Sequence, residues 1–143
     1  MADRNETFLH RWFEEVWNKR RADAIDEMLD CDGVAHGLTD ESGNELCGPE
    51  AFKPFFERFL GAFPDLRVTV EDAIEEGDMV ACRCTVSGTH TGEGIGMAAT
   101  RKPVTFSGMC MVRLKDGKIV EAWNNFDFMS MYQQMGLMQL PGA

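Results

Sequence analysis

The spacing of hydrophobic residues changes at Arg67, and this change limits the fold more than any other feature of the chain. Before it, hydrophobic residues recur every three or four positions, which is typical of amphipathic helices. The three predicted helices carry Phe8, Leu9, Trp12, Phe13, Val16 and Trp17; then Ala24, Ile25, Met28 and Leu29; then Phe52, Phe55, Phe56, Phe59, Leu60 and Phe63. The third starts at Gly-Pro, ends before Pro64, and has Pro54 in its first turn, where proline is tolerated.

From Arg67 onward the chain forms extended runs, residues 67–92 and 103–126, broken by the polar turns "EEGD" and "KDGK". Such runs predict a meander of antiparallel strands, with residues 91–102 as a loop. In the second run, hydrophobic residues occupy both even-numbered and odd-numbered positions, so neither face of the predicted sheet is fully solvated. Phe106, Cys110, Val112 and Leu114 would lie on one face, and Met109 and Met111 on the other. Because the helices can cover only one face, the other is predicted to be buried in a homodimer or a higher homo-oligomer.

The length of 143 residues and the hydrophobic content of 44% predict a single domain over residues 1–143. The formal net charge of −10 argues against nucleic acid and membrane surfaces as partners, because both are bound mainly through clustered Lys and Arg. The N-terminal residues contain no uninterrupted apolar segment, and no run is long enough to span a bilayer. We therefore expect a cytoplasmic protein.

The cysteines fit the same location. There are five, Cys31, Cys47, Cys82, Cys84 and Cys110. An odd count without a secretion signal disfavours a disulfide framework. Cys82 and Cys84 share one face of a predicted strand, unlike the C-x-x-C turn of redox and zinc sites. We expect them to be buried free thiols, since free cysteine behaves as a small hydrophobic residue.

Several phrases of the chain resemble the SnoaL-like polyketide (ester) cyclases of the nuclear-transport-factor-two-like superfamily. They are "EEVWNKRRADAIDEML", "GPEAFKPFFERFLGAFPDLRVTVEDAIEEGDMVACR", "GTHTGE", "DGKIVEAWNNFD" and "QQMG", in the family's order and spacing. The resemblance covers nearly the whole chain. It implies an α+β, cystatin-like fold in which a curved antiparallel sheet forms a cone with the N-terminal helices packed on it. It also implies a pocket for a small apolar or aromatic ligand, and no cofactor.

In the cyclases of this family, an aspartate after the tryptophan of the last strand is the general acid/base of an intramolecular aldol closure, and Asp127 matches it. The resemblance therefore implies aldol closure, or another proton transfer, on an aromatic or polyketide-like ketone or ester. One carboxyl can take and return the proton where a dry aromatic environment raises its pKa. Strict alternation places Trp123, Asn125 and Asp127 on one face, which predicts that they share the pocket. Asn125 would then donate a hydrogen bond to a substrate carbonyl or enolate oxygen.

Asp127 has a second interpretation, because "DFMSMYQQMG" also predicts an N-cap followed by a short helix that ends at Gly136. A capping carboxylate accepts backbone N–H groups and performs no catalysis. On this hypothesis the chain is a non-catalytic, small-molecule-binding dimer of the same fold. Binding of a flat apolar ligand is expected under either hypothesis.

Other ligand contacts are predicted at His36, His90, Phe59 and Met109. The two histidines resemble pocket residues of the family in their placement, and as neutral imidazoles they would orient a substrate carbonyl or hold Asp127. Phe59 and Met109 would supply apolar contacts. No short-spaced pair of ligands supports a metal site, so none is predicted.

Two related enzymes fit less well. Limonene-type epoxide hydrolases use an Asp-Arg-Asp arrangement, but Thr85 stands two positions after Arg83, and Asn125 two positions after Trp123. Without those carboxylates, epoxide hydrolysis is the weaker alternative. Ketosteroid isomerase needs a neutral acid donor and a tyrosine beside its aspartate base. The single tyrosine, Tyr132, lies in the last predicted helix.

Overall fold

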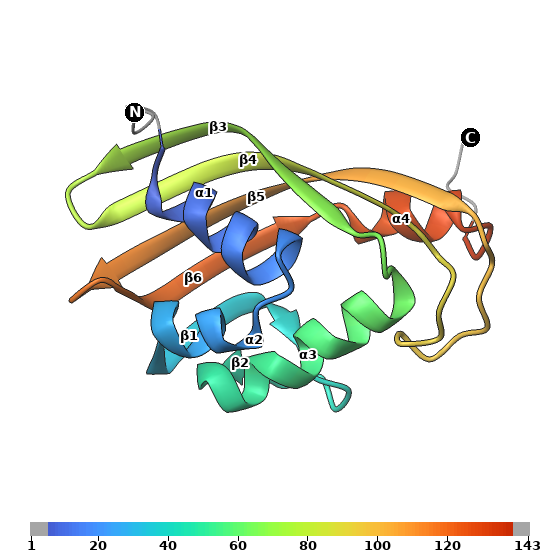
Figure 1. Cartoon of the computed structure of the whole chain (residues 1–143), viewed down its shortest axis with the longest axis horizontal. Coiled ribbons are helices and arrows are strands. Elements are labelled where there is room, and N and C mark those ends of the chain that lie inside the picture. Colours follow the sequence, from blue (N-terminus) through green and yellow to red (C-terminus); the bar gives the residue numbers. More distant parts are fainter. Residues whose placement is uncertain (1–5, 139–143) are drawn as a thin grey trace.

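The computed structural model describes residues 6–138, which form helices packed on one sheet (Figure 1). The elements are α1 (Phe8–Trp12), the π-helix η1 (Phe13–Asn18), α2 (Ala22–Met28), β1 (Leu29–Thr39), β2 (Glu45–Cys47), α3 (Gly48–Ala62), β3 (Arg67–Glu76), β4 (Met79–Thr89), β5 (Pro103–Lys115), β6 (Lys118–Phe126) and α4 (Phe128–Gln134). No helix within these residues has the length and hydropathy needed to cross a membrane.

The prediction that strands begin only at Arg67 is wrong, because β1 and β2 precede α3. β1 starts at Leu29, which the sequence pattern assigned to the second helix, and it pairs with β6. Leu29 pairs with Ile119 but Val34 pairs with Glu121, so the intervening residues of β1 bulge out of register. A bulge interrupts the alternation of side chains, which explains why the sequence did not show this strand.

All six strands form one sheet in the order β2-β1-β6-β5-β4-β3. The β1–β6 pair is parallel and the other neighbours are antiparallel. The predicted meander is therefore confirmed for β3 to β6, with turns at residues 77–78 and 116–117. Asp116 and Gly117 both have positive φ, as in the two-residue hairpin turn whose twist matches that of the strands.

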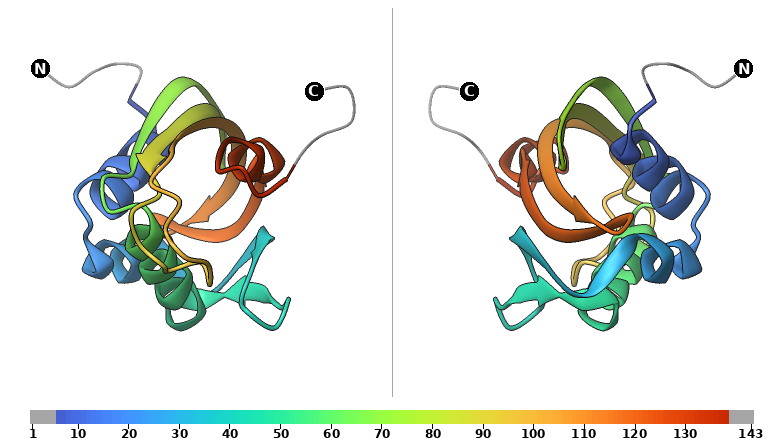
Figure 2. Two further views of the ribbon diagram at one scale, coloured as in Figure 1. Left: turned by 90° about the vertical axis from the view of Figure 1, so that its right-hand side faces the viewer. Right: turned by 90° about the vertical axis from the view of Figure 1, so that its left-hand side faces the viewer.

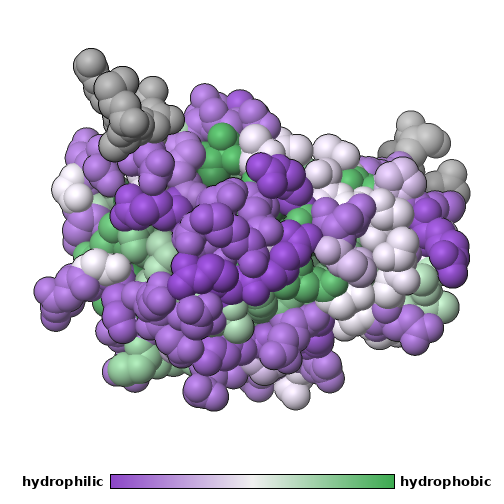
Figure 3. All heavy atoms as spheres, in the orientation of Figure 1, coloured by the Kyte–Doolittle hydropathy of each residue, from purple (hydrophilic) through white to green (hydrophobic). Residues whose placement is uncertain are grey.

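The sheet curls around a core, and the N-terminal helices lie against its concave face (Figure 2). Strand β5 shows this sidedness, because its buried residues Val104, Phe106, Cys110 and Val112 alternate with exposed ones. Helix α4 and the loop between β4 and β5 stand at one end of the curled sheet (Figure 2). The side that carries the helices is largely hydrophilic at its surface (Figure 3). This arrangement confirms the predicted α+β cone.

Aromatic side chains join α3 to η1. The ring of Trp17 lies 6.1, 6.2 and 5.3 Å from the rings of Phe52, Phe55 and Phe56, measured between centroids. Trp12 adds an edge contact to Phe52 at 5.4 Å. Such aromatic pairs contribute roughly 0.5–1.5 kcal/mol each beyond the area they bury. The cluster therefore fixes the helical layer as a unit.

Pro54 does not lie in the first turn of α3, as the sequence predicted. The helix already begins at Gly48, so Pro54 lies in its interior. Proline has no N–H to donate to the carbonyl four residues earlier, here that of Glu50. Pro54 and Glu50 are both exposed, so water can solvate the carbonyl that the missing hydrogen bond leaves free.

Two side-chain amides bind the backbone of the sheet. Asn18 donates from Nδ2 to the Val68 carbonyl at 2.9 Å and accepts the Val68 N–H at 2.8 Å, as a neighbouring strand would. Gln134 of α4 makes the same pair of bonds with Thr105, each 2.8 Å long. The first and last helical segments are thereby tied to β3 and β5.

We predict that Asn18→Ala lowers the free energy of unfolding by about 1–3 kcal/mol, because it leaves both polar groups of Val68 without their partner in a half-buried contact. Urea unfolding followed by circular dichroism measures the change. Asn125→Ala is the matched control, since Asn125 is exposed, and we expect it to stay within about 0.5 kcal/mol of wild type. Equal effects of the two substitutions would contradict the role of Asn18.

Candidate functional site: a two-part cavity

Two hollows meet at the end of the cone that carries α4. The inner cavity has a volume of about 70 Å³ and lies between the concave face of the sheet and the helices. The outer recess has a volume of about 450 Å³. Four residues line both hollows, Leu38, Phe55, Phe59 and Phe128. We therefore treat them as one site with an apolar interior and a wider mouth.

The inner cavity is almost wholly apolar. Among the described residues that line it, Asn124 is the one with a side-chain amide, and the others are aliphatic, aromatic or cysteine. Asn124 donates from Nδ2 to the His36 carbonyl at 3.0 Å. The remaining N–H and the Oδ1 of Asn124 have no other hydrogen-bond partner among residues 6–138. Asn124 can thus present both a donor and an acceptor to a ligand.

A glycine makes room for an aromatic wall of this cavity. Gly108 on β5 pairs with Phe126 on β6, and both side-chain positions face the interior. A Cβ at position 108 would overlap the ring of Phe126, at 2.2 Å from its nearest atom. A side chain at Gly108 would therefore displace Phe126, which lines the cavity together with Phe128.

The prediction that Trp123, Asn125 and Asp127 share the pocket is wrong in its geometry. Arg113 pairs with Glu121 while Leu114 pairs with Ile119, so Val120 is an extra residue in β6. Such a β-bulge exchanges the two faces of the strand beyond it. As a result Ala122, Asn124 and Phe126 line the cavity. Trp123, Asn125 and Asp127 lie outside its lining, and Asn125 and Asp127 are exposed.

Asp127 is the N-cap of α4. Its Oδ1 accepts the backbone N–H of Ser130 at 3.0 Å, and its own N–H donates to the Ser107 carbonyl at 3.0 Å. Within the part of the chain that the structure describes, the other carboxylate oxygen, Oδ2, makes no hydrogen bond. The predicted capping contact is present. Asp127 stands between two residues of the cavity wall, Phe126 and Phe128, but is itself exposed and outside the cavity lining.

His36 lies in an ion cluster on the outer face of the sheet, not at the ligand cavity. Its Nδ1 is 2.7 Å from Glu45 and its Nε2 is 2.7 Å from Glu121. The hydrogen bond to Glu121, followed by that to Glu45, raises the pKa of His36. Glu121 also pairs with Arg113 at 3.4 Å, and the Arg113 guanidinium lies 5.7 Å from the centre of the Trp123 ring. The predicted ligand contact of His36 is not supported by this geometry.

His90 is fully buried and lies outside the lining of both hollows. Its Nδ1 accepts the Thr100 N–H at 3.2 Å, so the proton of the neutral ring is on Nε2. Nε2 has no hydrogen-bond partner among the described residues. The ring packs on Phe63 with centroids 5.4 Å apart. These contacts hold the loop of residues 90–102 to the core, and they do not bring His90 to a ligand.

The two apolar contacts predicted from the sequence have different outcomes. Phe59 lines both hollows and packs on Phe128 with ring centroids 5.8 Å apart. Met109, in contrast, is 60% exposed on the outer face of the sheet, because β5 directs Gly108 and Cys110 inward. Met109 cannot contact a ligand in the cavity of its own chain.

Sequence reasoning missed Arg58, which lines the outer recess. The walls of this recess come from the end of β1, from α3, from α4 with Tyr132, and from residues 94–96 of the loop between β4 and β5. The loop approaches α3 closely, since the Gly92 N–H donates to the Ala62 carbonyl at 3.1 Å. A helical spacing of three from Phe55 places Arg58 near the same side of α3 and could have identified it.

Three cysteines are buried, as predicted for Cys82 and Cys84. Cys82, Cys84 and Cys110 are buried, whereas Cys31 and Cys47 are exposed. Contact with Cys110 raises the pKa of Cys82 to about 12, and contact with Cys82 raises the pKa of Cys84. The raised pKa keeps Cys82 and Cys84 as neutral thiols, which serve as small apolar residues.

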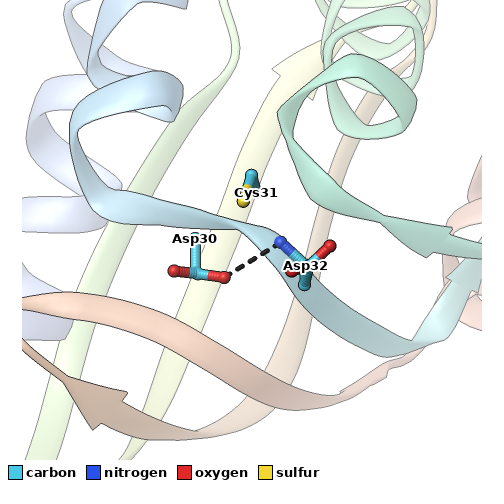
Figure 4. A group of neighbouring side chains, drawn as sticks. All are labelled: Asp30, Cys31 and Asp32. Carbon is cyan, nitrogen blue, oxygen red and sulfur yellow. Dashed lines mark hydrogen bonds between the residues drawn. The ribbon is translucent and has the colours of Figure 1, made fainter.

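One group of metal-capable side chains occurs within residues 6–138: Asp30, Cys31 and Asp32 on β1 (Figure 4). Asp30 Oδ2 accepts the Asp32 N–H at 2.9 Å, which explains the position of Asp30 without an ion. Cys31 and Asp32 are exposed. The group belongs to the bulge of β1 and does not border either hollow.

Comparison with known proteins agrees with this architecture. The model of the family described as SnoaL-like polyketide cyclase matches residues 7–135. The aklanonic acid methyl ester cyclase DnrD of Streptomyces peucetius is 30% identical over 129 residues, which are 90% of this chain and 88% of DnrD. The aklanonic acid methyl ester cyclase DauD of Streptomyces sp. (strain C5) is also 30% identical, over 90% of this chain and 80% of DauD.

Solved structures give the same result. IdmH of Streptomyces antibioticus superposes with a TM-score of 0.79 at 28% identity, covering 94% of this chain and 99% of IdmH. AclR of Streptomyces galilaeus has a TM-score of 0.73 at 31% identity, covering 89% of this chain and 78% of AclR. TsrD of Streptomyces laurentii, at 21% identity and a TM-score of 0.80, covering 96% of this chain and all of TsrD, shares the fold.

We predict that His36 stabilises the fold most at low pH. Its folded-state pKa is raised above the unfolded value, so its contribution is complete below about pH 6.5 and is lost as the pH rises through the folded-state pKa. Urea unfolding should therefore show a larger difference between wild type and His36→Gln at about pH 6 than at about pH 9. Glu45→Gln, which removes one of the two negative charges that contact His36, should reduce that pH dependence. A difference that grows with pH would contradict the assignment.

Proposed function

Because the chain belongs to the SnoaL-like polyketide cyclase family, we propose that it binds a flat, polyketide-derived ketone or ester and closes a ring by intramolecular aldol addition without a cofactor. The observation that carries this proposal is the two-part cavity, with its apolar interior and polar mouth. Pockets for small molecules are typically lined by hydrophobic and aromatic groups, with a few polar groups that fix orientation.

The sizes of the two hollows indicate how such a substrate lies. Ligand pockets are typically about 300–1,000 Å³, so the inner cavity alone is too small for a polycyclic compound. At about 70 Å³ it accepts one end of the substrate, and the recess of about 450 Å³ accepts the rest. Phe59 and Phe128, which line both, would contact the ring system where it passes from one to the other. Asn124 would bind an oxygen at the inner end.

The reaction requires one proton to be moved twice. A base removes a proton from a carbon flanked by carbonyl groups, the resulting enolate carbon attacks a second carbonyl, and the alkoxide so formed takes a proton back. We propose Asp127 for this role, on its match to the aspartate of the cyclases and on its position between Phe126 and Phe128. Its unbonded Oδ2 is the reacting atom, and the carboxylate must turn toward the cavity when substrate binds.

Non-catalytic binding is the second candidate function, and a specific observation favours it. Asp127 is an exposed helix cap outside the cavity lining, which is the arrangement expected if it has no role in chemistry. On this alternative the cavity still takes a flat apolar ligand. Substitutions that separate capping from proton transfer therefore distinguish the two functions.

We predict that Asp127→Asn lowers the rate of ring closure by about 10²–10⁴-fold while leaving stability within about 0.5 kcal/mol, because asparagine caps helices as well as aspartate but cannot take a proton. Asp127→Ala should lose the activity and also about 1 kcal/mol of stability. The activity is measured with aklanonic acid methyl ester, the compound named for two relatives. Full activity of Asp127→Asn would reduce Asp127 to a cap. Ligand binding by wild type without turnover would favour the binding function.

The outer face of the sheet supports the predicted homodimer. Strand register aligns a row of residues across five strands: Ile74, Ala81, Met111, Trp123 and His36. Ile74, Met109 and Met111 are exposed, so this face carries an apolar patch. Exposed apolar patches of this kind mark protein interfaces. The patch is bordered by charged pairs of both signs, which suits a second copy of the same surface.

We predict that Met109→Lys weakens self-association by about tenfold or more, because it places an unpaired charge in an apolar contact. Sedimentation velocity across a concentration series gives the dissociation constant. Glu57→Lys, on the exposed side of α3, adds a positive charge away from the sheet and should leave association unchanged. A monomeric wild type, or a Met109→Lys variant that associates as wild type does, would contradict this interface.

A further inference from the structure

We propose that Arg58 binds an anionic oxygen of the ligand, so that the preferred substrate is a flat polycyclic compound with a phenolate, enolate or carboxylate at one edge. This inference rests on the proposed function of the cavity, and it names the chemical class of the ligand. The oxygen would lie in the outer recess, with the apolar rings directed toward the inner cavity.

The position of Arg58 places a positive charge at the point where the apolar interior opens. Arg58 is the one cation among the described residues that line the outer recess, and its side chain is 23% exposed. Phe55, one turn earlier on α3, and the next residue, Phe59, line both hollows. The guanidinium carbon lies 5.9 Å from the centre of the Phe55 ring, so the cation rests beside the aromatic wall.

Arg58 makes one hydrogen bond and one ion pair, both of them long, and most of its N–H groups have no partner among the described residues. Nη1 is 3.3 Å from Glu41 and Nη2 is 3.4 Å from the Thr39 carbonyl. Charge-assisted bonds of this type are normally about 2.7–2.9 Å, and guanidinium has five N–H groups. Arg21 and Arg83 form closer pairs in the same molecule, with shortest distances of 2.6 and 2.7 Å. Arg58 is therefore weakly paired, although it is the least exposed of these three arginines.

The two acids beside Arg58, Asp40 and Glu41, leave most of its N–H groups free. Asp40 Oδ1 accepts the N–H groups of Ser42 and Asn44 at 2.8 and 2.9 Å. The bond from Asn44 contributes most to lowering the pKa of Asp40, so this carboxylate is held in its own turn. Glu41 is 81% exposed and contacts Arg58 through a single long ion pair. Since exposed ion pairs of this kind are weak, a ligand oxyanion can displace Glu41 from Arg58.

The chemistry of the proposed reaction requires such a group. An aldol addition passes through an enolate, and a donor aimed at the developing oxyanion stabilises it. Arginine presents parallel N–H groups that fit the two oxygens of a β-dicarbonyl enolate or a carboxylate. The net charge of −10 repels anions from most of the surface, so a single weakly paired cation at the mouth gives both orientation and selectivity.

The test compares two probes of one shape, anthracene-2-carboxylate and its neutral carboxamide, by fluorescence titration at about pH 7. We expect wild type to prefer the carboxylate. Arg58→Met should weaken carboxylate binding by about tenfold or more and change carboxamide binding by less than about twofold. Arg58→Lys should be intermediate, because it keeps the charge but not the paired donors. Glu41→Gln should tighten binding of the carboxylate alone, since it removes the competing charge.

The outcomes separate this inference from the function on which it rests. Binding of both probes with no selective loss in Arg58→Met, or no gain in Glu41→Gln, overturns the role of Arg58 and leaves the cavity as a ligand site. Failure of wild type to bind either probe overturns the proposed cavity function together with the inference. Glu41→Gln leaves Arg58 and the core intact, so the test does not depend on the folding of Arg58→Met.

Discussion

Packing of Trp17 on the phenylalanines of α3 holds the helical layer together, and the shape of the cavity follows from it. A curved sheet has a concave face that must be covered, and among residues 6–138 the N-terminal helices form the large cover. The aromatic cluster of Trp17, Phe52, Phe55 and Phe56 fills one part of the cone with rigid rings. The apolar surface that these rings do not fill is the inner cavity, so core packing and ligand site are parts of one arrangement.

The β-bulge at Val120 decides which chemistry faces this cavity. It turns Asn124 and Phe126 inward and sends Trp123 to the outer face, where it joins Arg113 and the ion cluster of His36. The lining of the inner cavity therefore contains one side-chain amide, that of Asn124, among apolar groups. Charged groups are confined to the mouth, where water can still solvate them. A substrate with an apolar ring system and a polar edge matches this division.

The position of Asp127 connects the two candidate functions. The carboxylate of Asp127 is held at the N-terminus of α4 by the backbone N–H of Ser130. Proton transfer instead requires the carboxylate to leave that environment for a drier one. The capping bond to Ser130, at 3.0 Å, is thus both a structural contact and the interaction that substrate would have to break.

Local periodicity was enough to predict the three N-terminal helices, the antiparallel meander with its turns at residues 77–78 and 116–117, and the burial of Cys82, because helical and strand periodicities are properties of short segments. The sequence was also enough to identify the family. The inward face of β6 and the presence of β1 could not be predicted in this way, because the bulges that set them depend on pairing between distant strands. The sequence did contain one indication of the correct face of β6. The alternate positions that include Glu121 and Asn125 are more polar than those that include Ala122 and Phe126, as expected for an outward-facing side. Asn124, and not the predicted Asn125, lines the inner cavity, and Arg58 lines the outer recess. Both positions follow from packing between segments that are distant in the sequence.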